Sequence, residues 1–189
     1  MINGNYQRRY LRAPYKEDII YADGAHALKA STLNISEMGL LVDHLPSFPD
    51  TDEVPLMFSL GTIPHLKNLN LYKLQTFSPE LFESTIIRAR AKMVRREQLS
   101  QDLDNIFKSR FGLEFVRIFP QDQQKIKNYV ETFASNLVYL QTLIDSYNSD
   151  DETKLRTRAL ARILGYKSDE KIAKLRMEVS LDYKSLQWL

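Results

Sequence analysis

The hydrophobic period of this chain changes at Pro120, and this change constrains the fold more than any other feature. Before Pro120, the segment Thr85–Val94 alternates apolar residues with the charged Arg88, Arg90 and Lys92. A period of two is typical of a strand with one buried face. After Pro120 the apolar residues recur at alternate spacings of four and three, which is typical of a helix that buries one stripe. The sequence therefore predicts a β-rich part followed by a helical part.

Five further segments before or just at Pro120 carry strand-like patterns bounded by turn signals. They are Tyr15–Ala22, Ala27–Ile35, Leu40–Val42, Val54–Leu60 and Gly112–Phe119. In the last of them, Leu113, Phe115 and Arg117 are expected on one side. Several short strands separated by turns predict a small antiparallel barrel. The leucine-rich insertion 62–83 is longer than a hairpin loop needs, and we expect one helical turn in it, near Pro79–Phe82.

The helical part begins with an unbroken heptad pattern. Its apolar positions are Ile126, Val130, Phe133, Leu137, Leu140, Ile144 and Tyr147. Pro120 suits the first turn of this helix, which should end near Tyr147. The helix either closes its own barrel or forms an intermolecular coiled coil, so a homo-oligomer through Ile126–Tyr147 stays open.

Two more helices are predicted in the tail of the chain. Ser149 and Glu152 have the spacing of a capping box for the first of them. Gly165 suits its C-terminus, and Ser168 is expected to cap the last helix. That helix carries an apolar stripe of Ile172, Leu175, Val179 and Leu186. Because such a stripe needs a partner surface, we expect the tail and the leucine-rich insertion to form one added unit, with contact to a second subunit as the alternative.

The composition argues against several classes of protein. The 189 residues contain no cysteine, which rules out disulfides, thiolate metal sites and a cysteine nucleophile. The formal net charge of +2 is too small to indicate nucleic-acid binding by the chain as a whole. No stretch approaches the roughly 18 apolar residues of a membrane-spanning helix, so we expect no membrane insertion and a cytoplasmic protein.

The sequence also lacks the patterns that accompany catalysis. The three histidines, His26, His44 and His65, have no spacing typical of metal ligands, so no metal site is expected. With six glycines in the chain, a glycine-rich phosphate cradle is not expected either, and no hydrolase or dinucleotide-binding motif occurs. The sequence therefore predicts a binding protein without a cofactor, not an enzyme.

Two short motifs carry the functional signal. The first is an RxxxR pattern with an additional arginine, Arg8-Arg9-Tyr10-Leu11-Arg12. The second is an NxSxxG pattern, Asn34-Ile35-Ser36-Glu37-Met38-Gly39. Alone, the first is typical of a solvated basic leader and the second of a turn in which glycine supplies a positive φ. Their order, and their separation by two predicted strands, make the pair more specific than either motif.

With these motifs and the barrel pattern, the chain resembles the PilZ family of bacterial cyclic di-GMP receptors over about residues 6–147. The resemblance implies a fold that is mainly β with added α: a six-stranded antiparallel PilZ-type barrel, a closing helix and a C-terminal helical extension. The implied parts are a flexible arginine arm at 1–14, the barrel and closing helix at 15–147, and the extension at 148–189. The implied function is a receptor or effector that converts the level of this second messenger into a conformational or protein-interaction change.

The resemblance also implies the ligand contacts. Arg8, Arg9 and Arg12 would clamp phosphates and guanine edges, Asn34 and Ser36 would hydrogen-bond a guanine, and Gly39 would let the backbone come close. Guanine offers O6 and N7 to the fork of an arginine, and phosphates form charge-assisted bonds with it. Many family members have Asp where this chain has Asn34, so affinity is expected to be lower. A bulky residue at Ser36 or Gly39 is expected to damage binding while the barrel survives.

Several alternatives stay open at this point. Arg88, Arg90 and Lys92 are either the solvated side of a strand or a basic face near the ligand, in which Arg88 and Arg90 would be auxiliary contacts. The chain is alternatively a degenerate adaptor of the same fold that works only through protein contacts, and its downstream partner is unknown. The spacing of Ala161–Gly165 also suggests a DNA-binding helix-turn-helix in the tail. The apolar positions that such a motif requires next fall on Lys171 and Lys174, which favours an antiparallel helical hairpin.

Overall fold

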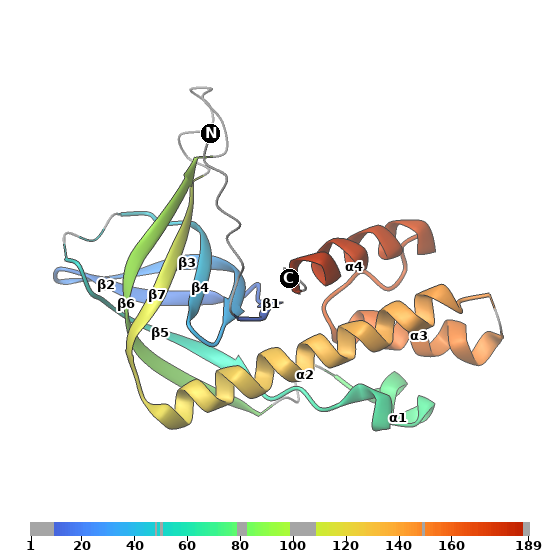
Figure 1. Ribbon diagram of the computed structural model, residues 1–189. Coiled ribbons are helices and arrows are strands. Elements are labelled where there is room, and N and C mark those ends of the chain that lie inside the picture. Colours follow the sequence, from blue (N-terminus) through green and yellow to red (C-terminus); the bar gives the residue numbers. More distant parts are fainter. Residues whose placement is uncertain are drawn as a thin grey trace. The chain divides into compact units, whose positions relative to one another are not determined.

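The computed structural model describes residues 10–47, 49, 51–78, 83–98, 109–148 and 150–186. The chain divides into two compact units (Figure 1). The barrel unit contains Arg12–Gly61 and Ser84–Val130, and the helical unit contains the described residues of 1–11, 62–83 and 131–189. The insertion and the tail therefore belong to one unit, as their apolar residues led us to expect. The division differs from the boundaries after residues 14 and 147 that the sequence suggested.

Seven antiparallel strands make up the sheet of the barrel unit. They are β1 (Arg12–Pro14), β2 (Asp18–Asp23), β3 (His26–Ser36), β4 (Gly39–His44), β5 (Val54–Gly61), β6 (Ser84–Gln98) and β7 (Ser109–Ile118). Their order is β1-β3-β2-β5-β6-β7-β4, and pairing of β3 with β4 closes β2 to β7 into a six-stranded barrel. The expected barrel is thus confirmed, with one strand more than expected. We expected the residues of β1 to belong to the flexible arm, because a strand of three residues is too short to show a hydrophobic period.

Strand alternation builds the interior of this barrel. In β5, Val54, Leu56, Phe58 and Leu60 are buried while the residues between them are exposed. The Phe58 ring stacks on Phe115 of β7 and meets Tyr15 edge to face, with centroids 6.1 and 5.9 Å apart. Each fully buried side chain of this size contributes roughly 1.5–3 kcal/mol to folding. The alternation predicted for β6 is observed for Ile87, Ala89 and Ala91, which are buried, whereas Met93, expected on the same side, is 36% exposed.

A β-bulge in β7 changes which side Arg117 occupies. Ala91 pairs with Phe115, whereas the preceding residue Arg90 pairs with Arg117, so Val116 is an extra residue. An extra residue reverses the alternation beyond it. Arg117 therefore lies outside the barrel, with its side chain 73% exposed, and the expectation that it shares a side with Leu113 and Phe115 is wrong.

The helix α2 (Pro120–Asp145) begins in the barrel unit and continues into the helical unit. In the barrel unit it buries Ile126 and Val130, and its Tyr129 hydroxyl donates to the Pro14 carbonyl over 3.4 Å. In the helical unit the same stripe continues as buried Phe133, Leu137, Leu140 and Ile144. Because the single chain already buries these six positions, the stripe is not a free surface for an intermolecular coiled coil.

The helical unit joins the insertion to the tail through specific hydrogen bonds. The insertion forms η1 (Leu66–Asn68) and α1 (Leu71–Thr76), earlier than the expected turn near Pro79–Phe82, which lies outside the described residues. Buried Asn136 of α2 accepts from the Leu66 amide and donates to the Pro64 carbonyl, both over 2.9 Å. Arg156 of α3 (Asp151–Ile163) donates to the Leu69 carbonyl over 3.0 Å. These bonds satisfy the polar backbone of a segment with little regular structure.

The ends of the tail helices differ in part from the sequence expectation. The N-cap of α3 is Asp150, not Ser149, and its carboxylate accepts from the Thr153 amide over 2.7 Å. Gly165 is confirmed as the residue after the helix, with φ of 84° and a Tyr166 amide bond back to the Ala161 carbonyl. This pattern is a Schellman motif.

The last helix, α4 (Ile172–Leu186), begins four residues after Ser168, so Ser168 is not its cap. Arg158 of α3 explains the delay, because its Nη1 donates to the carbonyls of Ser168 and Glu170 and holds this stretch out of a helix. Residues 164–171 thus separate the two helices, more than the turn of three or four residues in a helix-turn-helix. The structure therefore does not support the DNA-binding interpretation of the tail. Leu175, Val179 and Leu186 are buried as expected.

Candidate ligand-binding site

The two sequence motifs meet on neighbouring strands of the barrel unit. Arg12 of β1 pairs with Ser36 of β3, and Ser36 pairs on its other side with Gly39 of β4. Between the motif positions, Ala13 and Ile35 are fully buried in the barrel. Because side chains alternate along a strand, Arg12 and Ser36 both occupy outward-facing positions, although Ser36 is only 8% exposed. Three strands thus form one row from the end of the arm to the glycine of the turn.

Asn34 lies two residues before Ser36 along β3 and therefore on the same outward face, in the next outward-facing row. Its partner on β1 is Pro14, and its partner on β4 is Leu41. Both β1 and the turn are fixed to other parts of the barrel unit. The Tyr129 hydroxyl contacts Pro14, and the Phe115 amide donates to the Met38 carbonyl over 2.8 Å. The outward face formed by β1, β3 and β4 is therefore held in a defined position.

Gly39 is required by the neighbouring strand. A Cβ at this position would lie 2.1 Å from the Leu113 carbonyl oxygen of β7. The described glycines with positive φ are Gly24 and Gly165, so Gly39 does not supply the φ that a turn glycine often supplies. The expectation that the barrel survives a bulky residue at Gly39 is wrong, because a side chain there would push β7 away.

Glu114 and Lys92 extend the row, and of these two residues sequence reasoning missed Glu114. Gly39 pairs with Glu114 of β7, which in turn pairs with Lys92 of β6. The Lys92 Nζ and Glu114 Oε2 atoms are 3.3 Å apart, and the Glu114 side chain remains 40% exposed. Only the register of β4 against β7 brings this carboxylate beside the motif, since nothing in the local sequence marks it.

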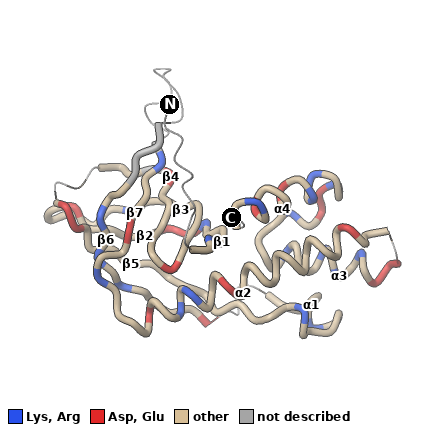
Figure 2. Tube along the Cα trace, in the orientation of Figure 1, with Lys and Arg blue, Asp and Glu red and all other residues tan. Residues whose placement is uncertain are grey.

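The other predicted site residues are not brought to this row. Arg8 and Arg9 lie outside the described residues. Arg88 and Arg90 are exposed on β6, which lies three strands from β3 in either direction around the ring. Figure 2 marks the positive charges of the barrel wall that contains β6. The structure thus separates the auxiliary basic face from Asn34, Ser36 and Gly39.

Two tyrosines near β1 remain neutral hydrogen-bond donors. Burial raises the pKa of Tyr15 and of Tyr129 far above the ordinary value, and the Glu17 carboxylate adds to both shifts. The Tyr15 hydroxyl donates to the Ser59 carbonyl, and the two rings meet edge to face with centroids 6.0 Å apart. This pair links β1, β5 and α2 beside the row.

The described residues contain no group of three or more His, Cys, Asp or Glu side chains that could hold a metal ion. None of the helices in the same part of the chain is both long and apolar enough to span a bilayer.

A closed six-stranded antiparallel barrel, with an extra N-terminal strand beside a polar hairpin and a helix after the last strand, defines a class of small barrel domains. The PilZ domain profile matches residues 6–132, which is more than half of the chain. The chain belongs to the PilZ domain family. No curated protein matches the chain.

Solved structures of low sequence identity are similar to this chain. The inhibitor of motility MotI/DgrA of Bacillus subtilis is 21% identical with a TM-score of 0.47, covering 66% of this chain and 49% of that protein. The PilZ domain with c-di-GMP of YcgR from Escherichia coli is 13% identical with a TM-score of 0.40, covering 67% and 91%. The K. pneumonia MrkH–c-di-GMP complex is 12% identical with a TM-score of 0.37, covering 76% and 55%. The chain thus spans about half the length of MotI.

Proposed function

We propose that this chain is a receptor for cyclic di-GMP in the bacterial cytoplasm and that it acts through a partner protein, not as an enzyme. The observation that carries the proposal is the pairing of Arg12 with Ser36 inside the segment that matches the PilZ family. This pairing puts a guanidinium position directly beside the polar positions of the NxSxxG turn. The two sequence motifs therefore act as one site.

Each position of the site offers a group that suits the ligand. The guanidinium of Arg12 has the fork that matches O6 and N7 of guanine, and Arg8 and Arg9 supply positive charge for the phosphates. Asn34 offers both a donor and an acceptor to a guanine edge, and Ser36 offers a hydroxyl. The ligand thus binds on the outside of the barrel, along the row that begins at Arg12.

Glu114 supplies the carboxylate that the turn lacks in this chain. Paired Cα atoms on neighbouring strands are about 4.5–5.5 Å apart. Glu114 lies two strands from Ser36 along this row, with only Gly39 between them. A carboxylate accepts strong hydrogen bonds from guanine N–H groups. Its ion pair with Lys92 is half-exposed and of the kind that contributes little to stability, so the ligand can replace it.

The closing helix is the route by which binding changes the protein. Both parts of the site contact α2 inside the barrel unit, through Tyr129 to Pro14 and through Gln123 Nε2 to the Met38 sulfur over 3.6 Å. A ligand bound at β1 and at the turn therefore acts on the first turns of α2. A change in this helix is what a partner protein senses.

Calorimetric titration of the full chain with cyclic di-GMP tests the proposal. The expected Kd is micromolar or lower, which corresponds to about −8 kcal/mol or better. The stoichiometry comes from the same titration. If the folded protein gives neither heat nor a thermal shift at a large excess of ligand, the proposal is wrong. The chain is then an adaptor that keeps the fold but does not bind cyclic di-GMP.

A further inference from the structure

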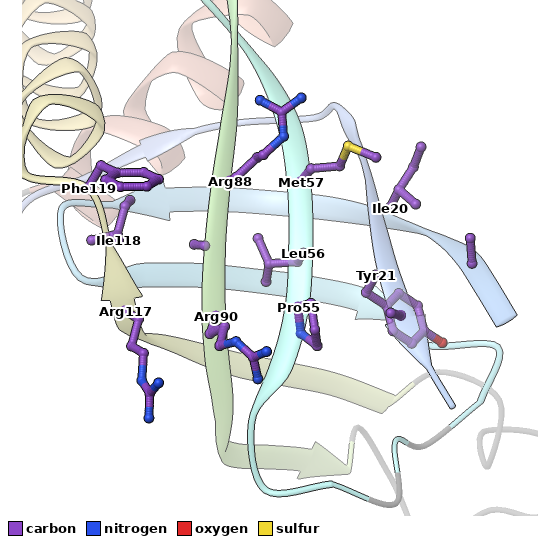
Figure 3. Close-up of a pocket in the computed structure, with 13 residues that line it drawn as sticks. Ile20, Tyr21, Pro55, Leu56, Met57, Arg88, Arg90, Arg117, Ile118 and Phe119 are labelled. Carbon is purple, nitrogen blue, oxygen red and sulfur yellow. The ribbon is translucent and has the colours of Figure 1, made fainter. Parts of the chain in front are cut away.

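The outer wall of the barrel carries a hollow that the proposed function does not use. It lies over β2, β5, β6 and β7, is also lined by Ala27 of β3, and has a volume of about 570 Å³ (Figure 3). This volume is within the range of about 300–1,000 Å³ found for specific binding sites. All four strands are paired on both sides, so nothing can bind here by adding a strand. Recognition at this outer hollow must therefore use side chains.

Apolar side chains lie on two sides of the middle of the outer hollow. Ile20 of β2 pairs with Met57 of β5, and both are at outward positions, 43% and 39% exposed. Phe119, just before α2, is 70% exposed at the other side. The outward face of an antiparallel sheet is normally polar, and clustered exposed apolar residues mark interaction sites.

Three arginines surround these apolar side chains. Figure 3 shows Arg88 pointing to one end of the outer hollow, and Arg90 and Arg117 pointing to the other. Arg90 and Arg117 are direct cross-strand partners, an arrangement of like charges that destabilises a sheet. The bulge at Val116 creates this arrangement by turning Arg117 outward, and bulges often re-aim side chains at functional sites.

Little negative charge compensates these arginines. The Arg117 Nε atom is 3.6 Å from the Glu53 carboxylate. Arg88 and Arg90 have no acidic partner in the part of the chain that the structure describes. The outer hollow therefore has positive charge at both ends and apolar surface in the middle.

We propose that the outer hollow is the docking site for an acidic peptide segment of a partner protein, with an aromatic or aliphatic side chain between carboxylates. The apolar side chain packs against Met57 and Phe119, and the carboxylates bind the arginines as charge-assisted pairs. Such a segment matches the charge at both ends and the apolar middle, whereas a nucleic-acid backbone would leave the apolar side chains unused. Arg88 and Arg90 lie on β6, three strands from β3 in the ring, and the residue of β3 that lines the hollow, Ala27, is nine positions before Ser36, so this site and the Arg12–Ser36 pair can be filled together. The inference adds an output surface to the proposed function without depending on it.

Fluorescence anisotropy of the full chain with three labelled twelve-residue peptides tests the docking site. The first alternates Asp or Glu with Phe or Leu, the second replaces its acids by amides, and the third replaces its apolar residues by serine. We expect saturable binding of the first peptide alone, and a loss of at least about tenfold in affinity for each of the others. No saturation with the first peptide up to about 1 mM would overturn the proposal.

Charge reversal locates the binding on the molecule. Arg90→Glu should weaken the first peptide by at least about tenfold, and so should Phe119→Ser, which removes an exposed ring. Lys127→Glu makes the same kind of charge change at an exposed position of α2 and should alter affinity less than about twofold. Equal losses in Arg90→Glu and Lys127→Glu would show nonspecific attraction and overturn the site. If a labelled DNA duplex binds more tightly than the peptide, and Arg90→Glu abolishes that binding, the site binds nucleic acid and the peptide proposal is wrong.

Titration of the same variants with cyclic di-GMP separates this inference from the proposed function. Arg90→Glu should keep the affinity for cyclic di-GMP, and Arg12→Ala should keep the affinity for the peptide. If the peptide binds while cyclic di-GMP does not, the docking site stands and the receptor proposal fails. If the opposite occurs, the receptor proposal stands alone.

Discussion

Arg12 and Ser36 are direct partners across an antiparallel strand pair, although they are 24 positions apart in the chain. The pair joins an arginine motif and a polar turn that the sequence presents as separate features. The pairing also makes Arg12 part of β1, while Arg8 and Arg9 precede the strand. Arg12 is half-buried and has contacts of its own in the free protein. This relationship leads to a first prediction about the ligand.

Arg12→Ala should weaken cyclic di-GMP binding by about 2–5 kcal/mol, because it removes a charged partner of guanine or phosphate. Arg12→Lys should keep part of the affinity, since it retains the charge and loses the fork. Lys16→Ala, an exposed position just beyond β1, serves as the control. Titration calorimetry measures all three variants. Unchanged affinity in Arg12→Ala would show that β1 does not contact the ligand.

Glu114→Gln should weaken cyclic di-GMP binding by about 1–3 kcal/mol, because an amide oxygen accepts weaker bonds from guanine N–H groups. Lys92→Gln is the matched control, since it breaks the same ion pair from the other side. Both variants should melt at similar temperatures, and only Glu114→Gln should lose affinity. Equal affinities would remove Glu114 from the site.

Asn34→Asp should keep or improve the affinity for cyclic di-GMP, because a carboxylate accepts stronger bonds than an amide. The Asn34 position is at the surface of the strand pair, so the change should cost the fold little. The same titration measures the effect. A marked loss of affinity would mean that the amide of Asn34 donates an essential bond to the ligand.

Gly39→Ala should destabilise the barrel by about 3 kcal/mol, because the new methyl group must displace the Leu113 carbonyl. Ser36→Ala provides the comparison, since it removes a hydrogen bond from the Ser36 Oγ to the Gly39 carbonyl and should cost only about 1 kcal/mol. Urea unfolding followed by circular dichroism gives both free energies. Wild-type stability in Gly39→Ala would contradict the close approach of β7.

Asn136→Ala should destabilise the helical unit by about 2–4 kcal/mol, because it leaves the Leu66 amide and the Pro64 carbonyl without their partner. Ser135→Ala, at an exposed position on the same helix, should have almost no effect. Thermal unfolding monitored by circular dichroism tests the pair. Similar melting curves for the two variants would show that the insertion does not depend on Asn136.

Local patterns predicted the barrel strands and α2, because Val54–Gly61 and Ile126–Ile144 have clear periods and buried faces. They failed where a single residue changes the register. The bulge at Val116 turns Arg117 outward, and no composition signal marks it. They also missed Glu114, which is 75 positions from Gly39 in the chain. Glu114 reaches the candidate site only because β7 pairs with β4. Sequence alone thus indicates which motifs matter, and the register decides which residues surround them.

The contact between Gly39 and the Leu113 carbonyl bears on how the NxSxxG motif is used to classify proteins. The barrel itself requires this glycine, because a Cβ there would clash with the Leu113 carbonyl oxygen, whereas Asn34 and Ser36 offer polar groups to the ligand. The residues of the motif therefore meet different physical requirements. A chain that had lost its ligand would be expected to keep the glycine and drift at the polar positions. In sequence surveys the glycine alone would then count as a marker of ancestry, and the polar letters with the arginines as the marker of signal reception.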